Sequence, residues 1–285
     1  MGSPCELRVW GCAAEVLTAA RAELERLEAK YSRYRDDSLT TRINRSAGSA
    51  ALALDAETAG LLDYAQQAWQ QSGGRFDLST GVLRRAWDFK SGKLPDPAVL
   101  ATARACVGWQ KLEWQRPRLR LPEGMELDFG GLVKEYAADR VAALLRERGA
   151  RGGMVDLGGD IAVVGPQPDG SAWRIGIRDP RRREAALAVI ELARGGLATS
   201  GDYERGMSIA GVRYSHLLDP LSGQPVRGAA SVSVAAPLCL LAGTASTSAM
   251  LMGEGAEAWL RDLGLPWLLV GQDAELRGSL GPVHS

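Results

Sequence analysis

The sequence predicts an α+β fold in which mixed or antiparallel sheets are flanked by helices, in one domain over residues 1–285. Three observations lead to this prediction. Helical and strand patterns are interleaved along the chain. Many connections between strands are too short for a crossover helix, which disfavours a uniform parallel sheet. No linker rich in Pro, Ser or Gly, no internal repeat and no low-complexity tract divides the chain.

The first half of the chain begins with a strand from Cys5 to Gly11, where apolar and polar residues alternate. A helix follows, because apolar residues from Leu17 to Tyr31 recur at three- and four-residue spacing. Capping residues and breakers then predict the remaining elements of this half. These are a loop over 32–44 in which Ser38 caps a short helix, an edge strand at 52–54, a helix over 56–72 that ends at Gly73-Gly74, a turn and short apolar helix over 75–89, a helix over 98–107, and two short strands over 111–121.

The second half opens with Asp128 at the end of a strand, followed by a Gly-Gly turn and a helix that carries Lys134. Later elements are predicted from alternation, apolar runs and turn glycines. They are two buried strands over 152–165 joined by a Gly-Gly bend, a strand over 173–180, strands and turns over 186–203, a strand over 231–237, a helix over 244–253 and a final hairpin over 267–279.

Composition narrows the function classes. Basic and acidic residues balance at 34 each, so no bulk charge indicates nucleic acid or an anionic membrane as a partner. No apolar run approaches the roughly 20 residues that a transmembrane helix needs. The 4 cysteines lack CxxC spacing and are interpreted as free thiols. The motifs GxGxxG, GxxxxGK[ST], HExxH and GxSxG do not occur, which counts against several common enzyme classes.

The segment LDFGGLVKEYAAD, residues 127–139, combines an acid (Asp128), a glycine turn (Gly130-Gly131) and Lys134. Glycines let the backbone approach a ligand closely, and the first turn of a helix offers unpaired N–H groups to phosphate. The segment therefore suits a phosphorylated ligand with a metal. A plain strand–turn–helix packing unit explains the same residues, and both interpretations stay open.

Four further segments are rich in polar and glycine residues: GGRFD (73–77), DLGGD (156–160), TSGDYERG (199–206) and RYSHLLDPLSG (213–223). Each has a structural interpretation as a helix cap or turn. Each also offers groups for a ligand, such as a Phe76 ring that stacks on a planar group and an Asp77 that accepts hydrogen bonds. His216 is the one histidine outside the C-terminal tail, so it is the natural carrier of a proton near neutral pH.

Taken in order, these segments resemble the bacterial FAD:protein FMN transferases of the ApbE family. The similar stretches span nearly the whole chain: MGSPCELRVWG, LEAKYSRYRDDSLTTRIN, SGGRFDLSTGVLRRAWDF, LDFGGLVKEYAADRV, VDLGGDIAVVG, LATSGDYERG, RYSHLLDPLSGQPV and SVSVAAP followed by TASTSAMLMG. Each motif is weak alone, but together and in register they are specific.

The resemblance implies a T-fold-like α+β domain that binds FAD and uses Mg²⁺. It implies cleavage of the FAD pyrophosphate, transfer of FMN to a Ser or Thr hydroxyl of an acceptor protein, and release of AMP. The implied acceptors are electron-transfer proteins such as subunits of membrane-bound redox pumps. No nucleic-acid partner and no transmembrane segment are expected.

The resemblance also assigns roles to residues of this sequence. The flavin-binding residues would be Met1, Tyr34, Arg75, Phe76, Asp77, Asp128, Lys134 and Leu217. The metal would be held by the Gly131 carbonyl and the Thr247 hydroxyl. His216 would handle the proton of the acceptor hydroxyl, and Lys134 would stabilise charge on the leaving phosphate.

The chain departs from the family pattern at one position. The family motif Ala-Asp-Ala-x-x-Thr carries an aspartate that binds the metal, and Gly243 stands in its place here. Three interpretations are open. Another acid, such as Asp160 or Asp202, substitutes; or the protein binds FAD without transferring FMN; or it hydrolyses FAD weakly or acts only at high magnesium.

The start MGSPCELRVWG lacks a basic region followed by an apolar one, so no secretory signal is visible. A cytoplasmic location is therefore expected. If the start is truncated, the expected location is periplasmic or associated with the inner membrane.

Overall fold

The computed structural model describes residues 3–179, 186–202 and 206–280. Contacts group the chain into two compact units. The first comprises Met1–Ala29, Gly131–Tyr203 and Gly228–Ser285, and the second comprises Lys30–Gly130 and Glu204–Arg227. The boundary between Gly130 and Gly131 falls inside the motif that carries Asp128 and Lys134.

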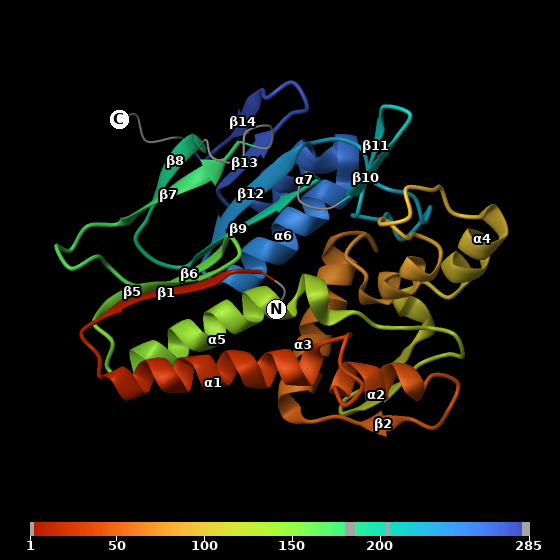
Figure 1. Cartoon of the computed structure of the whole chain (residues 1–285), viewed down its shortest axis with the longest axis horizontal. Helices are drawn as coiled ribbons and strands as arrows, with labels where there is room; N and C mark the ends of the chain where they lie inside the picture. The colour runs from red at the N-terminus through yellow and green to blue at the C-terminus, as the bar shows by residue number, and fades with distance from the viewer. Residues whose placement is uncertain (1–2, 180–185, 203–205, 281–285) are drawn as a thin grey trace. The chain divides into compact units, whose positions relative to one another are not determined.

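The first unit is built on a seven-stranded sheet with the order β1-β5-β6-β9-β12-β13-β14 (Figure 1). Its strands are β1 (Cys5–Trp10), β5 (Gly152–Leu157), β6 (Asp160–Gly165), β9 (Gly196–Gly201), β12 (Ser231–Ala236), β13 (Trp267–Val270) and β14 (Leu276–Gly278). Each neighbouring pair in the described residues is antiparallel, as the short connections predict. Gly158 and Gly159, at φ 71° and 94°, form the two-residue turn of the β5–β6 hairpin.

A two-stranded ribbon of β7 (Trp173–Arg178) and β8 (Ala186–Leu192) packs on this sheet. The inward side chains of the ribbon and sheet share one apolar cluster, with Ile175, Ile177 and Ile190 against Ile161 and Val163. Because side chains alternate along a strand, the residues between these face the other way. That leaves the opposite side of the sheet for helices.

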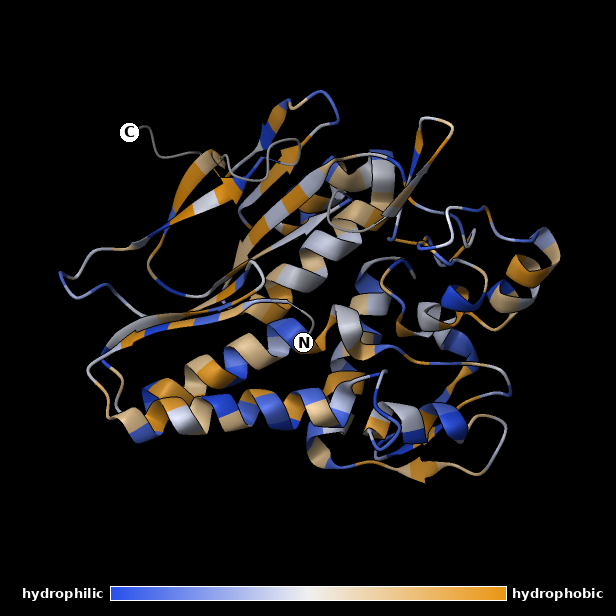
Figure 2. Ribbon diagram, viewed as in Figure 1, coloured by the Kyte–Doolittle hydropathy of each residue, from blue (hydrophilic) through white to orange (hydrophobic). Residues whose placement is uncertain are grey.

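The helices of this unit are α1 (Ala14–Tyr31, of which 30–31 fall in the second unit), α5 (Val133–Glu147), α6 (Cys239–Met252) and α7 (Ala256–Leu263). Helices α1 and α5 lie side by side, with Arg140 reaching Glu23 at 3.8 Å (Figure 1). Helix α6 contains no charged residue and is pale to orange along its length in Figure 2. Uncharged on all sides, it is a buried helix, as its packing on β9, β12 and α5 requires.

Helix α6 begins five residues before the predicted start at residue 244. No side chain of its own caps the first turn. Instead Asp139 of α5 accepts hydrogen bonds from the backbone N–H groups of Cys239 (2.9 Å) and Leu240 (2.8 Å). A carboxylate satisfies the open donors of a helix start in the way an adjacent cap would. A cap supplied from a different helix cannot be seen in the local sequence, which explains the late prediction.

The second unit holds α2 (Leu39–Arg45), α3 (Ala56–Gln71), α4 (Pro97–Ala105), a 3₁₀ helix (Leu78–Arg85), the small sheet β2-β4-β3 and the hairpin β10–β11. The strands are β2 (Leu52–Ala53), β3 (Glu113–Gln115), β4 (Arg118–Arg120), β10 (Gly206–Ile209) and β11 (Val212–Ser215). Ser38 caps α2 by accepting from the Thr41 N–H at 3.0 Å, as predicted. The hairpin joins the 3₁₀ helix and α4 in one cluster around Trp87, Leu100 and Met207.

One prediction for this unit is wrong: Asp128 does not end a strand, because residues 125–128 are irregular. The side chain of Asn44 accepts from the Leu127 N–H at 2.8 Å and donates to the Leu127 carbonyl at 2.9 Å. The Asp128 N–H donates to the Leu78 carbonyl at 2.9 Å. An amide side chain thus satisfies the backbone where a neighbouring strand was expected.

Across the described residues, no helix combines the length and the apolarity that crossing a bilayer demands. The α+β architecture with antiparallel sheets flanked by helices is confirmed by the pairing of the strands and the helices that accompany them.

Candidate active site

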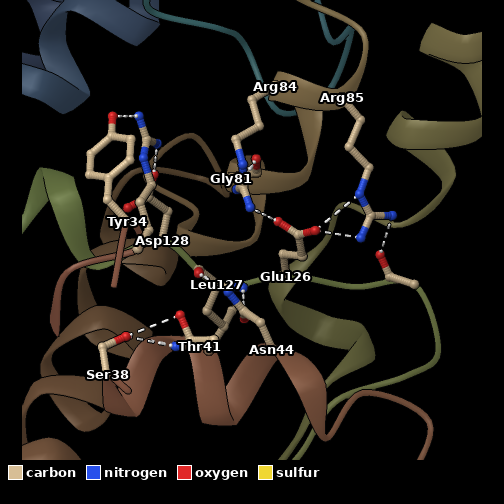
Figure 3. A network of polar contacts seen from close by, with 12 residues as sticks. Tyr34, Ser38, Thr41, Asn44, Gly81, Arg84, Arg85, Glu126, Leu127 and Asp128 are labelled. Atoms are coloured by element: carbon tan, nitrogen blue, oxygen red, sulfur yellow. Dashed lines mark hydrogen bonds and ion pairs between the residues drawn. The ribbon is translucent and has the colours of Figure 1, made fainter. Parts of the chain in front are cut away.

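Asp128 is held in place by a polar network in the second unit (Figure 3). Arg33 forms an ion pair with one carboxylate oxygen, and the other accepts from the Gly130 N–H at 2.9 Å. The same arginine donates to the hydroxyl of Tyr34 at 2.7 Å, and Tyr34 is 81% exposed. The network therefore presents an aromatic ring to solvent next to an oriented carboxylate.

The backbone beneath Asp128 leaves no room for a side chain at residue 81. A β-carbon built on Gly81 would lie 2.7 Å from the Asp128 β-carbon, so Gly81 is required for this packing. The neighbouring acid Glu126 is bound by Arg84 and Arg85 (Figure 3). The two acids around Leu127 are thus each tied to arginines from elements distant in sequence.

Asp77, in the GGRFD segment, is a buried N-cap of the 3₁₀ helix. Its carboxylate accepts from the Ser79 N–H (2.8 Å), the Ser79 hydroxyl (2.6 Å) and the Trp109 N–H (2.8 Å). Phe76 beside it is only 4% exposed. The cap interpretation of this segment is therefore confirmed, and the carboxylate orders the loop through three hydrogen bonds.

Replacing Asp77 by alanine is expected to lower the free energy of unfolding by about 3 kcal/mol, because two buried backbone donors lose their acceptor. Asp77→Asn keeps one acceptor oxygen and is expected to cost about 1 kcal/mol. Denaturant titration of the three proteins measures both differences. Equal stability of all three would show that the carboxylate does not order this loop.

The structure brings GGRFD together with the HLLDP segment of the second unit. Arg75 lies 3.5 Å from the Asp219 carboxylate, although 144 residues separate them. Asp219 also accepts from the Ser222 hydroxyl at 2.8 Å and closes a turn in which the Gly223 N–H donates to its carbonyl at 2.7 Å. Trp87 fixes the same turn by donating to the Gly223 carbonyl at 2.8 Å.

His216 follows directly after β11, and its side chain is half-buried. The backbone after it is anchored: the Leu217 N–H donates to the Ser215 hydroxyl at 3.1 Å, and the Leu217 carbonyl accepts from the Val226 N–H at 2.9 Å. The histidine is therefore carried on a rigid corner, within the same segment as Asp219. Rigid placement is what a proton-transfer group needs.

In the first unit, Lys134 stands in the first turn of α5 and forms an ion pair with Asp160, the first residue of β6, at 2.6 Å. The Asp160 side chain is 4% exposed and that of Lys134 is 27% exposed. The ammonium group thus lies at the edge of the interior, anchored on a buried carboxylate. Burial raises the pKa of Asp160, while the charge of Lys134 lowers it.

Glu135, next to Lys134, is buried and interacts with Asp160. Burial first, and then the charge of Asp160, raise the pKa of Glu135 to about 8, and the charge of Lys134 opposes both effects. Its Oε2 atom has no hydrogen-bond partner among the described residues. A buried acid of this kind was not singled out in the sequence, because only the packing of α5 on β6 and α6 reveals its surroundings.

Hydroxyl groups line the middle of α6. Ser200 on β9 lies 2.9 Å from the hydroxyls of both Ser246 and Thr247, and Thr199 lies 2.8 Å from Ser233. Gly131 has an open flank, because a β-carbon built there would meet no atom within 4 Å beyond its chain neighbours. Asp202, one of the two acids suggested as a substitute ligand, instead accepts from Gln272 at 2.9 Å.

The ligand atoms that these residues offer indicate which divalent metal they could bind. No group of three or more His, Cys, Asp or Glu side chains in the described ranges could hold an ion. The atoms present are carboxylate, hydroxyl and carbonyl oxygens, including the unpartnered Oε2 of Glu135. Oxygen ligands suit Mg²⁺, which also retains waters and binds substrate phosphates. The residues therefore fit magnesium better than zinc.

The predicted site residues are distributed over both units. Tyr34, Arg75, Phe76, Asp77, Asp128, His216 and Leu217 belong to the second unit, and Gly131, Lys134 and Thr247 to the first. Met1 lies outside the described residues. Sequence reasoning missed the partners that orient them, Arg33, Asp219 and Ser200. Each lies within a segment quoted in the sequence analysis, but nothing in those segments indicates which residue it contacts.

Comparison with known proteins gives a consistent result. The ApbE family matches residues 1–269. An FAD:protein FMN transferase of Treponema pallidum is 31% identical over 310 residues, covering 99% of this chain and 86% of that protein. The flavinyl transferase ApbE of Pseudomonas stutzeri, solved in its apo form, has a TM-score of 0.88 at 30% identity, covering 100% and 95% of the two chains. The ApbE protein of Thermotoga maritima has a TM-score of 0.87 at 28% identity, covering 96% and 93%.

Proposed function

The chain belongs to the ApbE family, and from this membership we propose that it is an FAD:protein FMN transferase that acts as one domain. The substrates are FAD and an acceptor protein with an exposed Ser or Thr, such as a subunit of a membrane redox pump. The observation that carries the proposal is the match of the family over residues 1–269, which includes every segment that supplies a site residue.

The reaction forms one bond and breaks one. The acceptor hydroxyl oxygen attacks the phosphorus on the FMN side of the pyrophosphate, and a phosphoester bond forms. The bridging P–O bond breaks, and AMP leaves with the bridging oxygen. A hydroxyl is a weak nucleophile until its proton is removed, and His216 accepts that proton.

The remaining residues bind and orient FAD. We propose that Tyr34 and Phe76 contact the flavin portion, with Arg75, Asp77, Asp128 and Leu217 shaping its pocket. Lys134 places a positive charge where the leaving phosphate becomes more negative. A magnesium ion, held by the Gly131 carbonyl and the Thr247 hydroxyl, would supply further stabilisation of phosphate charge when bound.

A second function is considered because Gly243 carries no side chain to bind a metal. The chain would then bind FAD without transferring FMN, or would hydrolyse FAD weakly to FMN and AMP. Hydrolysis and transfer share the same attack on phosphorus and differ only in the nucleophile, which is water in one and the acceptor hydroxyl in the other. The two reactions therefore differ in their product and not in the site they need.

One assay distinguishes these functions. The purified chain is incubated with FAD, Mg²⁺ and an acceptor domain that carries one target threonine, and with the matched Thr→Val acceptor. Transfer is expected to yield flavin-labelled acceptor and AMP in equal amounts, and no label on the valine form. AMP with free FMN would indicate a pyrophosphatase instead, and bound FAD with no AMP would indicate a binding protein.

A further inference from the structure

Glu135 is a buried acid of the first unit with one unsatisfied oxygen. Glu135 is 6% exposed, and its Oε2 atom has no hydrogen-bond partner in the part of the chain that the structure describes. A buried polar atom without a partner costs about 1–3 kcal/mol, and more when the group is charged. Such an atom in a folded protein therefore calls for a ligand that satisfies it.

The surroundings of Glu135 favour a cation as that ligand. Asp160 is a second buried acid that interacts with Glu135, and it already forms an ion pair with Lys134 at 2.6 Å. One ammonium group cannot balance two carboxylates, so ionising Glu135, whose pKa burial and the charge of Asp160 raise to about 8, would leave an excess of negative charge in a region of low dielectric. A divalent ion compensates that excess and gives Oε2 a partner at the same time.

Gly243 of α6 shows where the Glu135 carboxyl group lies. A β-carbon built on Gly243 would be 2.9 Å from Cδ and 3.0 Å from Oε1 of Glu135, with Cγ closer still. The Glu135 side chain therefore fills the space that a side chain at residue 243 would take. Thr247 is one turn further along the same face of α6, and its hydroxyl meets that of Ser200 at 2.9 Å.

We propose that Glu135 is the carboxylate ligand of the divalent cation in this protein and that Thr247 is its hydroxyl ligand. The Glu135 side chain extends from α5 into the space next to Gly243 of α6. The inference rests on the proposed function for the purpose of the metal but not for its location. It makes Glu135 the acid that replaces the missing aspartate ligand, a role for which the sequence suggested Asp160 or Asp202. It also explains how α6 can carry glycine at residue 243: the anionic charge reaches the site from the facing helix.

The first experiment measures Mn²⁺ binding to the full chain, with and without FAD, from the electron paramagnetic resonance signal of free Mn²⁺. Glu135→Gln keeps the shape of the side chain but removes its charge. It is expected to weaken binding at least about tenfold, as loss of an anionic metal contact does. Glu147→Gln, at the exposed end of the same helix, is the matched control and should bind as the unmodified chain does.

The second experiment moves the carboxylate across to α6. Glu135→Ala removes the three atoms nearest to a β-carbon at residue 243, so Glu135→Ala with Gly243→Asp is expected to recover most of the Mn²⁺ affinity that Glu135→Ala loses. Gly243→Asp alone is expected to lower the melting temperature, because its β-carbon would overlap Glu135. Circular dichroism and thermal unfolding are the checks that each variant is folded.

The results separate this inference from the proposed function. Full Mn²⁺ affinity in Glu135→Gln, no recovery in the folded double variant, or no Mn²⁺ binding by the unmodified chain would overturn the ligand assignment, even if FMN transfer proceeds. Conversely, a chain that transfers no FMN but loses Mn²⁺ with Glu135→Gln would support the ligand assignment and contradict the transferase.

Discussion

Replacing Lys134 by methionine is expected to reduce both FMN transfer and stability. Transfer should slow by about 10²–10³-fold, the usual loss when one charge-stabilising group is removed from a reacting phosphate or oxyanion. The free energy of unfolding should fall by about 2–3 kcal/mol, because the buried Asp160 loses its partner at 2.6 Å. This is below the loss for a fully buried pair, since 27% of the Lys134 side chain is exposed. Single-turnover kinetics and denaturant titration measure the two effects.

A double variant separates the two effects of Lys134. Adding Asp160→Asn to Lys134→Met removes the uncompensated buried charge, so stability should recover while transfer stays slow. If transfer recovers together with stability, Lys134 only supports the fold. If Lys134→Met transfers FMN at the original rate, the lysine has no part in the reaction.

Replacing His216 by asparagine is expected to slow FMN transfer by about 10²–10⁴-fold and to leave FAD affinity nearly unchanged, because asparagine forms hydrogen bonds but cannot take up a proton. The backbone bonds of Leu217 to Ser215 and Val226 should survive, so the corner should remain folded. The measurements are single-turnover transfer at saturating FAD and FAD binding by fluorescence quenching.

Two controls distinguish proton transfer from a structural role. Added imidazole should restore part of the rate of His216→Asn, which a packing defect would not allow. The same substitution at His284, the other histidine of the chain, should leave the rate unchanged. Loss of FAD binding in His216→Asn, with no rescue by imidazole, would remove the histidine from its proposed role.

Local sequence rules were sufficient where one short segment contains all of its own partners. Ser38 and the Thr41 N–H are three residues apart, and the Gly158-Gly159 turn joins adjacent strands, so both were predictable. The rules failed where the partner comes from elsewhere. Asp139 starts α6 from another helix, and Asn44 replaces a strand partner for Leu127.

For the candidate site as well, contacts within a short segment were predictable and contacts between distant segments were not. Motif order proposed Asp128, Lys134, His216 and Thr247 as candidates, because a short motif preserves the type and spacing of its own residues. It could not identify the partners that orient them, such as Arg33 for Asp128 and Asp219 for Arg75. It also could not show that the Asp77 carboxylate binds Ser79 and Trp109, since Trp109 is distant in sequence.

By itself, the sequence determined the α+β class, the order of most elements and the family, because periodicity, turn glycines and motif order are properties of consecutive residues. Only the tertiary structure decided which charges meet. Lys134 and Glu135 are neighbours in sequence, yet one reaches the edge of the interior and the other is enclosed beside Asp160 and above Gly243. The physical reason is that the energy of a charge depends on burial and on partners from other elements, which the packing of α5, β6 and α6 creates.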